Sequence, residues 1–220
     1  THLVVSAGLF DVPNLTATLG LQSVNDFGSD KYNSGSTAQG GNNKSAEYDT
    51  VLDAQHAMLS EASIDYKINK TALHAGRSQV NLDNQRFIGT VGWRQNERSY
   101  DTAYVADNSV ENLNLLVAYV WGFQGVTATP TTDTNTVLLH ADYKVMDELS
   151  ITAYDYMLSN IHDTAGIALT GEINLSVAKL DYRAEYASQS DATMDRQSLN
   201  DTNGTVGVAG TKGQADATYM

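Results

Sequence analysis

The feature that most constrains this chain is a strand-length segment in which charged and apolar residues alternate without interruption. It runs Lys179-Leu180-Asp181-Tyr182-Arg183-Ala184-Glu185-Tyr186. Successive side chains of a β-strand point to opposite faces, so the four charged residues share one face and the apolar and aromatic residues share the other. Charges of both signs must be hydrated or paired with one another. The segment therefore predicts a sheet with one apolar face and one ionic face.

The same alternation recurs along most of the chain and predicts about eleven strands of about eight to ten residues, the length with which a tilted strand crosses a bilayer. The expected strands are 3–10, 15–24, 60–67, 72–79, 99–106, 113–121, 136–144, 149–158, 167–174, 179–186 and 213–220. For the strand 149–158, the sequence does not decide which face is apolar, because the charged Asp155 lies on the same face as Ile151 and Ala153.

Short turns and long polar segments separate these strands in alternation. The turns lie near Pro13, Asn69, Asn108, Asp147 and Leu175, and the long segments follow Val24, Gln79, Trp121, Leu158 and Gln189. This pattern predicts an all-β fold, an antiparallel transmembrane β-barrel with short turns at one end and long loops at the other. We expect residues 1–220 to form a single barrel domain. Because both ends fall in expected strands, we also expect an incomplete portion of a barrel of about 16–18 strands.

Composition excludes several classes of protein. No apolar run approaches the ~20 residues of a membrane-spanning helix, which excludes a helical membrane protein. The 26 acidic residues exceed the 13 basic residues and give a net charge of -13, which argues against a nucleic-acid partner. The chain has no cysteine, so it has neither disulfides nor thiolate metal sites.

One segment is rich in arginine. Arg77, Arg86, Arg94 and Arg98 lie close together in the sequence, with Asp83 between them. One hypothesis is a loop folded into the interior of the barrel, where fixed guanidinium groups screen anionic solutes. The alternative is a hydrogen-bonded loop whose Arg–Asp pairs hold its shape, and the two are compatible.

The same segment carries a family resemblance. Gly76-Arg77 closes a strand, Asp-Asn-Gln-Arg-Phe-Ile-Gly follows at 83–89, and Trp-Arg-Gln-Asn follows at 93–96. These motifs resemble the signature of the alginate-export family of outer-membrane porins, and residues 179–189 are similar to that family as well. The resemblance implies a monomeric antiparallel barrel with a constricted, charged pore, which in the best-known members passes an anionic polysaccharide. By position, Arg77, Arg86 and Arg94 match the motif.

Enzyme motifs are missing from the sequence, so we expect no enzyme. The histidines at 2, 56, 74, 140 and 162 lack metal-ligand spacing, and no Gly-x-Ser-x-Gly elbow is present. Asp181 and Glu185 could imitate a paired-carboxylate centre, but Arg183 between them favours a salt-bridged wall. No cofactor is expected; the one alternative is Ca²⁺ bound by oxygen ligands of the acidic segments 26–33 or 191–203.

These observations together predict a passive diffusion channel for small polar or charged solutes in the outer membrane of a Gram-negative bacterium. The expected pore-lining residues are Lys179, Asp181, Arg183, Glu185, His140, Asp142 and Lys144, and the expected constriction loop contains Arg77, Arg86, Arg94, Arg98 and Asp83. The expected partners are the lipid bilayer, lipopolysaccharide and small hydrophilic solutes, and the expected assembly is a monomer or a homotrimer. The alternative is a secreted or surface soluble β-sandwich that acts by binding and buries its apolar faces against each other.

Overall fold

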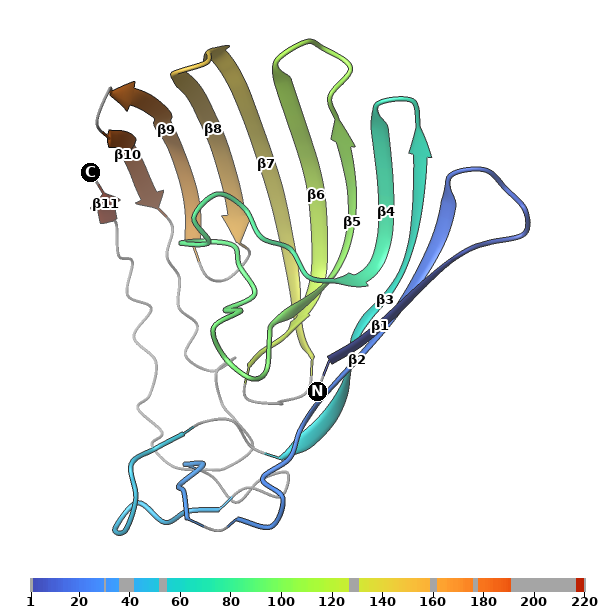
Figure 1. Ribbon diagram of the computed structural model, residues 1–220, viewed down its shortest axis with the longest axis vertical. Helices are drawn as coiled ribbons and strands as arrows, with labels where there is room; N and C mark the ends of the chain where they lie inside the picture. The colour runs from blue at the N-terminus through green and yellow to red at the C-terminus, as the bar shows by residue number, and fades with distance from the viewer. Residues whose placement is uncertain are drawn as a thin grey trace. The chain divides into compact units, whose positions relative to one another are not determined.

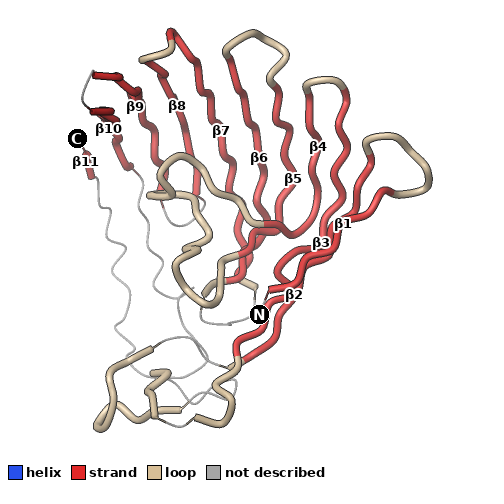
Figure 2. The backbone as a smooth tube through the Cα atoms, in the orientation of Figure 1, coloured by secondary structure: helices blue, strands red, loops and turns tan. Residues whose placement is uncertain are grey.

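The computed structural model describes residues 2–29, 31–35, 42–51, 55–126, 131–158, 162–175, 178–190 and 217–219. In these residues the chain consists of strands, turns and loops (Figure 2). The strands are β1 (His2–Gly8), β2 (Leu15–Val24), β3 (His56–Ile68), β4 (Thr71–Ser78), β5 (Ser99–Asp107), β6 (Leu113–Gln124), β7 (Thr132–Met146), β8 (Leu149–Leu158), β9 (His162–Leu175), β10 (Ala178–Ser190) and β11 (Ala217–Tyr219). Nowhere in the described part of the chain is there a helix of the length and apolar character needed to cross a membrane.

The strands form one sheet in which each strand neighbours the next one along the chain, from β1 to β11 (Figure 1). The pairs β1–β2, β2–β3, β7–β8, β8–β9, β9–β10 and β10–β11 are antiparallel. The predicted all-β antiparallel fold is therefore confirmed. A sandwich needs two sheets packed face to face, whereas the strands described here all belong to a single sheet.

The chain divides into two compact units. The first comprises Thr1–Ile68, Ala72–Ala103 and Val120–Asp133, and the second comprises Asn69–Thr71, Tyr104–Tyr119 and Thr134–Met220. Strands β4, β5, β6 and β7 therefore contribute residues to both units. Each unit has buried side chains of its own, including Met58 and Tyr100 in the first and Leu138 and Tyr156 in the second.

Within each unit, the exposed face of the sheet is the apolar one. In the second unit Val117, Tyr143 and Ile167 are 54%, 47% and 48% exposed. In the first unit Leu19 and Ile64 are likewise exposed, whereas polar residues of the opposite face are buried. A soluble antiparallel sheet buries its apolar face and exposes its polar face. The inverse arrangement is the one that a lipid-facing barrel wall requires.

Several strands extend beyond the range in which the sequence alternates. Strand β9 begins at His162 instead of residue 167, so only residues 159–161 separate it from β8. The prediction of a long polar segment after Leu158 is therefore wrong. Residues 162–166 pair with β8 and β10 as regular strand, but they are mostly small or polar and carry no alternating signal. Hydrophobic periodicity detects only the part of a strand that has an apolar face.

Strand β3 contains a bulge that the sequence did not predict. Glu61 pairs with Gly20 and Leu59 pairs with Leu21, which leaves Ser60 as an extra residue. An extra residue shifts the alternation by one position. Accordingly Met58 and Ser60 are buried before the shift, and Ser63 is buried after it.

Candidate functional site

The four charged residues of β10 lie on one face of that strand and pair with one another and with β9. Lys179 Nζ lies 2.5 Å from Glu172 Oε2 and 3.7 Å from Asp181 Oδ1. Arg183 donates from Nη2 to Glu185 Oε1 at 2.9 Å and from Nε to Glu185 Oε2 at 3.2 Å. The side chains of Lys179 and Asp181 are 55% and 74% exposed, whereas those of Arg183 and Glu185 are 26% and 6% exposed. The row is thus hydrated at the turn end and buried toward the other end.

Tyr154 of β8 joins this row from two strands away. Its hydroxyl donates to Glu185 Oε1 at 2.8 Å. The side chain crosses β9 at Gly166, which is the register partner of both Tyr154 and Ala187. A Cβ atom at Gly166 would lie 2.4 Å from the Tyr154 ring, so the crossing requires glycine there. Tyr154 also stacks on Tyr156, with ring centroids 4.8 Å apart.

Sequence reasoning missed this tyrosine pair because the facing of 149–158 was open. The structure places Thr152, Tyr154 and Tyr156 on the buried face and Asp155 on the other. One residue in the sequence could have indicated this packing. Gly166 lies inside a strand, and a glycine there often marks a position where another group approaches the backbone closely.

The other expected pore-lining residues, His140, Asp142 and Lys144, lie on the same face of β7 as Thr136 and Leu138. Thr152 donates to Asp142 Oδ2 at 2.9 Å. Lys144 Nζ lies 2.7 Å from Asp147 Oδ1 in the turn after β7, and this hydrogen bond holds the pKa of the Asp147 carboxyl below its usual range. His140, between Leu138 and Asp142 on this face, is half-buried.

The segment 79–98 between β4 and β5, drawn in green in Figure 1, is fixed to the sheet by buried side chains. Gln22 of β2 is 3% exposed and donates from Nε2 to the Glu97 carbonyl at 3.1 Å. The Tyr100 hydroxyl donates to the Gly89 carbonyl at 2.8 Å and accepts from the Gly89 N–H at 3.2 Å. Two points of the segment are therefore tied to β2 and β5.

Bonds within the segment complete its shape. Asn81 Oδ1 accepts from the Thr90 N–H at 2.9 Å, and the Arg98 N–H donates to the Thr90 carbonyl at 2.8 Å. Leu82 N–H donates to the Ile88 carbonyl at 3.1 Å and closes a smaller turn. Of the two anchors on the sheet, the bond from Gln22 to Glu97 joins residues 75 positions apart, so no local motif predicted it.

The structure places the four arginines of the expected constriction in different surroundings. Arg77 is held by Asp101 through bonds of 2.7 and 2.8 Å, and it donates to Gln124 Oε1 at 3.0 Å. Arg94 lies over the Trp93 ring at 5.5 Å, and Arg98 lies over the Phe123 ring at 5.3 Å. Arg86 and Asp83 are exposed in the turn 82–88. Arg77 therefore joins β4 to β5 and β6, and Arg98 contacts Phe123 of β6, whereas Arg86 and Arg94 lie within the loop.

A polar chain of three side chains lies on β3 and β4. His74 Nδ1 is 2.7 Å from Asp65 Oδ1, and His74 Nε2 is 3.0 Å from Ser78 Oγ. His74 is 5% exposed, so its ring is almost completely buried. Sequence spacing did not show the arrangement, because the partners of His74 come from a neighbouring strand and from four residues along its own strand.

The expected calcium segments do not gather metal ligands in the described residues. Asp26 accepts from the Gly28 N–H at 2.8 Å, from Gln55 Nε2, and from the Tyr32 hydroxyl at 3.2 Å. Burial and this bond to Asp26 raise the pKa of the Tyr32 hydroxyl. In the part of the chain that the structure describes, there is no group of three or more His, Cys, Asp or Glu suited to a metal ion. Segment 191–203 lies outside the described residues.

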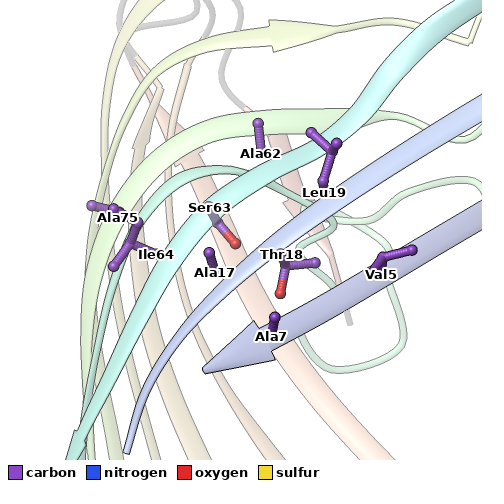
Figure 3. Close-up of a pocket in the computed structure, with 9 residues that line it drawn as sticks. All are labelled: Val5, Ala7, Ala17, Thr18, Leu19, Ala62, Ser63, Ile64 and Ala75. Carbon is purple, nitrogen blue, oxygen red and sulfur yellow. The ribbon is translucent and has the colours of Figure 1, made fainter. Parts of the chain in front are cut away.

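A shallow depression on strands β1 to β4 lies on the apolar face (Figure 3). Small side chains at Ala7, Ala17, Ala62 and Ala75 line it, beside the larger Leu19 and Ile64. Because its lining is almost wholly apolar, it offers a polar solute little hydrogen bonding.

No protein-family model matches the chain, and no curated protein matches its sequence. The fold is similar to that of Pseudomonas aeruginosa OccK8 (OprE), with a TM-score of 0.63 and 15% identity over 93% of this chain and 52% of that one. It is similar to the outer membrane protein OpdK from Pseudomonas aeruginosa, with a TM-score of 0.64 and 10% identity over 99% of this chain and 53% of that one.

A third similar structure is Pseudomonas aeruginosa OccK2 (OpdF), solved in complex with glucuronate, with a TM-score of 0.57 and 11% identity over 83% of this chain and 45% of that one. These structural neighbours are outer-membrane porins of the Occ and Opd type. The chain spans about half the length of each of them. At these identities the likeness shows the fold, a portion of an antiparallel transmembrane β-barrel.

Proposed function

We propose that this chain forms part of an outer-membrane porin, a passive diffusion channel for small polar or charged solutes. The observation that carries the proposal is the inverted sheet, in which large apolar side chains are exposed on one face and paired charges stand on the other. In a bilayer the apolar face contacts acyl chains and the polar face borders water. The fold shared with Occ and Opd porins supports this assignment.

The proposed pore wall consists of Lys179, Asp181, Arg183, Glu185, His140, Asp142 and Lys144. Fixed charges of opposite sign along a narrow water-filled path create a transverse field, which orients and selects charged solutes. Size exclusion does the rest, with no energy input. The glucuronate bound to OccK2 supports small carboxylated sugars as one class of solute for this channel.

The proposed constriction is the segment 79–98. Arg86, Arg94, Arg98 and Asp83 would narrow the path, and Arg77 would hold the strands from which the loop leaves through its bonds to Asp101. The anchoring of the segment by Gln22 and Tyr100 supports a loop that keeps its position during solute passage.

The proposal places the chain in the outer membrane of a Gram-negative bacterium, with residues 1–220 in one barrel domain. Its neighbours are the bilayer lipids and lipopolysaccharide, and its assembly is a monomer or a homotrimer. Membership of the alginate-export family is the finer proposal, supported by the motifs around Arg77, Arg86 and Arg94. Liposome swelling with glucuronate and with an oligomeric uronate separates a monosaccharide channel from a polysaccharide exporter.

Replacing Arg183 by glutamate tests the pore wall. The change reverses a fixed charge beside Glu185, so the channel should favour cations more strongly. The measurement is the reversal potential across a planar bilayer with a salt gradient, using the full-length protein. Lys70→Glu makes the same charge change in the turn between β3 and β4 and should shift the reversal potential less. An equal shift in the two variants, or none in Arg183→Glu, contradicts the proposed placement of Arg183.

A further inference from the structure

The chain of Asp65, His74 and Ser78 has the connectivity of a nucleophilic triad. A carboxylate contacts one ring nitrogen of a histidine and a serine hydroxyl contacts the other, at 2.7 and 3.0 Å. Both distances are within hydrogen-bond reach, which is the geometric requirement for an activated serine. The Asp65 carboxylate favours the tautomer with hydrogen on Nδ1, which leaves Nε2 to accept from Ser78.

The contact between His74 and Ser78 spans Gly76 of β4. Residues four apart on a regular strand are separated by roughly 13 Å, too far for a histidine to reach a serine directly. Between them Gly76 has φ of 131°, and a Cβ atom there would lie 2.2 Å from the Ala62 carbonyl oxygen. Gly76 therefore departs from regular strand geometry and lies too close to β3 for any side chain, at the point that the His74–Ser78 contact spans.

We propose that Asp65, His74 and Ser78 form a nucleophilic triad, with Ser78 an acylation site for small activated esters. This activity goes beyond the channel function and does not depend on it. Ser78 is 9% exposed and is the last residue of β4, beside the start of the segment 79–98. Its burial restricts the ester to a small acyl group.

The reaction needs only the ester and water. Ser78 Oγ attacks the carbonyl carbon, and its proton passes to His74 Nε2. The carbon–oxygen bond of the leaving alcohol then breaks, and the alkoxide takes the proton from His74. Water adds to the acyl-serine by the same steps, releases a carboxylic acid and restores the serine. Asp65 acts as a positioning residue, since it orients the ring and touches no substrate.

The test uses the full-length protein folded in detergent and diisopropyl fluorophosphate as the probe. The expected result is transfer of a diisopropylphosphoryl group to Ser78 with loss of fluoride, detected by mass spectrometry of the peptide that contains Ser78. Ser78→Ala should remove the label. His74→Gln should slow labelling about 100-fold or more, the range that a general base contributes. Asp65→Asn should slow labelling while heat-modifiable migration and conductance stay unchanged, and Asp65→Glu should restore part of the rate.

Ser60→Ala is the matched control. Ser60 Oγ is 3.2 Å from His2 Nε2, and the carboxylate of Glu61 lies 3.6 Å from the same nitrogen. Because the serine and the carboxylate share one ring nitrogen, this cluster differs from a triad, in which they contact opposite nitrogens of the histidine. This variant should label like the unaltered protein. No label on Ser78, or an equal rate in folded His74→Gln, overturns the triad. Ion conductance is measured on the same samples, so a failed triad leaves the porin proposal intact and a failed pore leaves the labelling result intact.

Discussion

At the scale of single residues, the contact between Tyr154 and Glu185 depends on the absence of a side chain between them. Gly166 lies under the tyrosine ring, and the hydroxyl reaches a carboxylate that is 6% exposed. A nearly buried carboxylate needs its partners, because an unpaired buried charge is strongly unfavourable. The glycine thus leaves room for the hydrogen bond that Tyr154 gives to the Glu185 carboxylate.

Gly166→Ala should destabilise the protein by about 1–3 kcal/mol, because the new methyl group would displace the Tyr154 ring. The measurement is the urea midpoint of the folded form, followed by heat-modifiable migration on a gel. Gly8→Ala is the control, since a Cβ there would have its nearest neighbour, the Leu15 carbonyl oxygen, at 3.9 Å. Equal midpoints for the two variants would contradict the proposed packing.

Tyr154→Phe should lower the free energy of unfolding by about 1–3 kcal/mol, since it removes a hydrogen bond to a buried charge. Tyr143→Phe is the control, because Tyr143 is 47% exposed on the opposite face. The double variant Tyr154→Phe with Gly166→Ala should lose less free energy of unfolding than the sum of the losses in the two single variants, because both changes act on the same contact. Full additivity would show that Gly166 acts independently of this bond.

At the scale of elements, the segment 79–98 holds its place through anchors on β2 and β5. Gln22→Ala removes the bond to Glu97 and should raise the rate of trypsin cleavage after Arg86 and Arg94 about tenfold, equivalent to losing about 1.4 kcal/mol of anchoring. Thr18→Ala, earlier in β2, should leave cleavage unchanged. An unaltered digestion pattern for Gln22→Ala would show that other contacts hold the segment.

The sequence predicts those elements whose pattern is local. Alternation located β2 and β8 to the residue and assigned the faces of β10, because each residue's parity carries the information. It did not locate the bulge at Ser60, since the bulge becomes visible only when β3 is paired with β2.

The anchors of the segment 79–98 and the contacts of His74 lay beyond sequence reasoning for the same reason. Gln22 and Glu97 are 75 residues apart, and only the fold brings them together. The arginine cluster was recognisable as a group, but the separate role of Arg77 was not. Its distinction comes from Asp101 and Gln124 on the neighbouring strands β5 and β6.

At the scale of the whole molecule, the inverted sheet separates a membrane wall from a soluble surface. Val117→Arg should destabilise a bilayer-inserted barrel by about 2–4 kcal/mol if this position lies near the midplane, because arginine would then face lipid. In a soluble protein the same change at a 54% exposed position would be nearly neutral. Folding yield into liposomes at graded urea measures the difference.

Asn114→Arg supplies the comparison for Val117→Arg. Asn114 is an exposed residue of the same strand, and its side chain has the opposite parity. It should tolerate arginine because water solvates that face. Equal tolerance at both positions would remove the evidence for lipid contact.

The single extra residue at Ser60 constrains how this protein can change over time. Loss of that residue, or gain of one elsewhere in β3, would exchange the lipid-facing and the water-facing side chains of the strand from that point onward. Length variation in β3 should therefore be confined to paired insertions or paired deletions, while the connecting loops remain free to vary by any number.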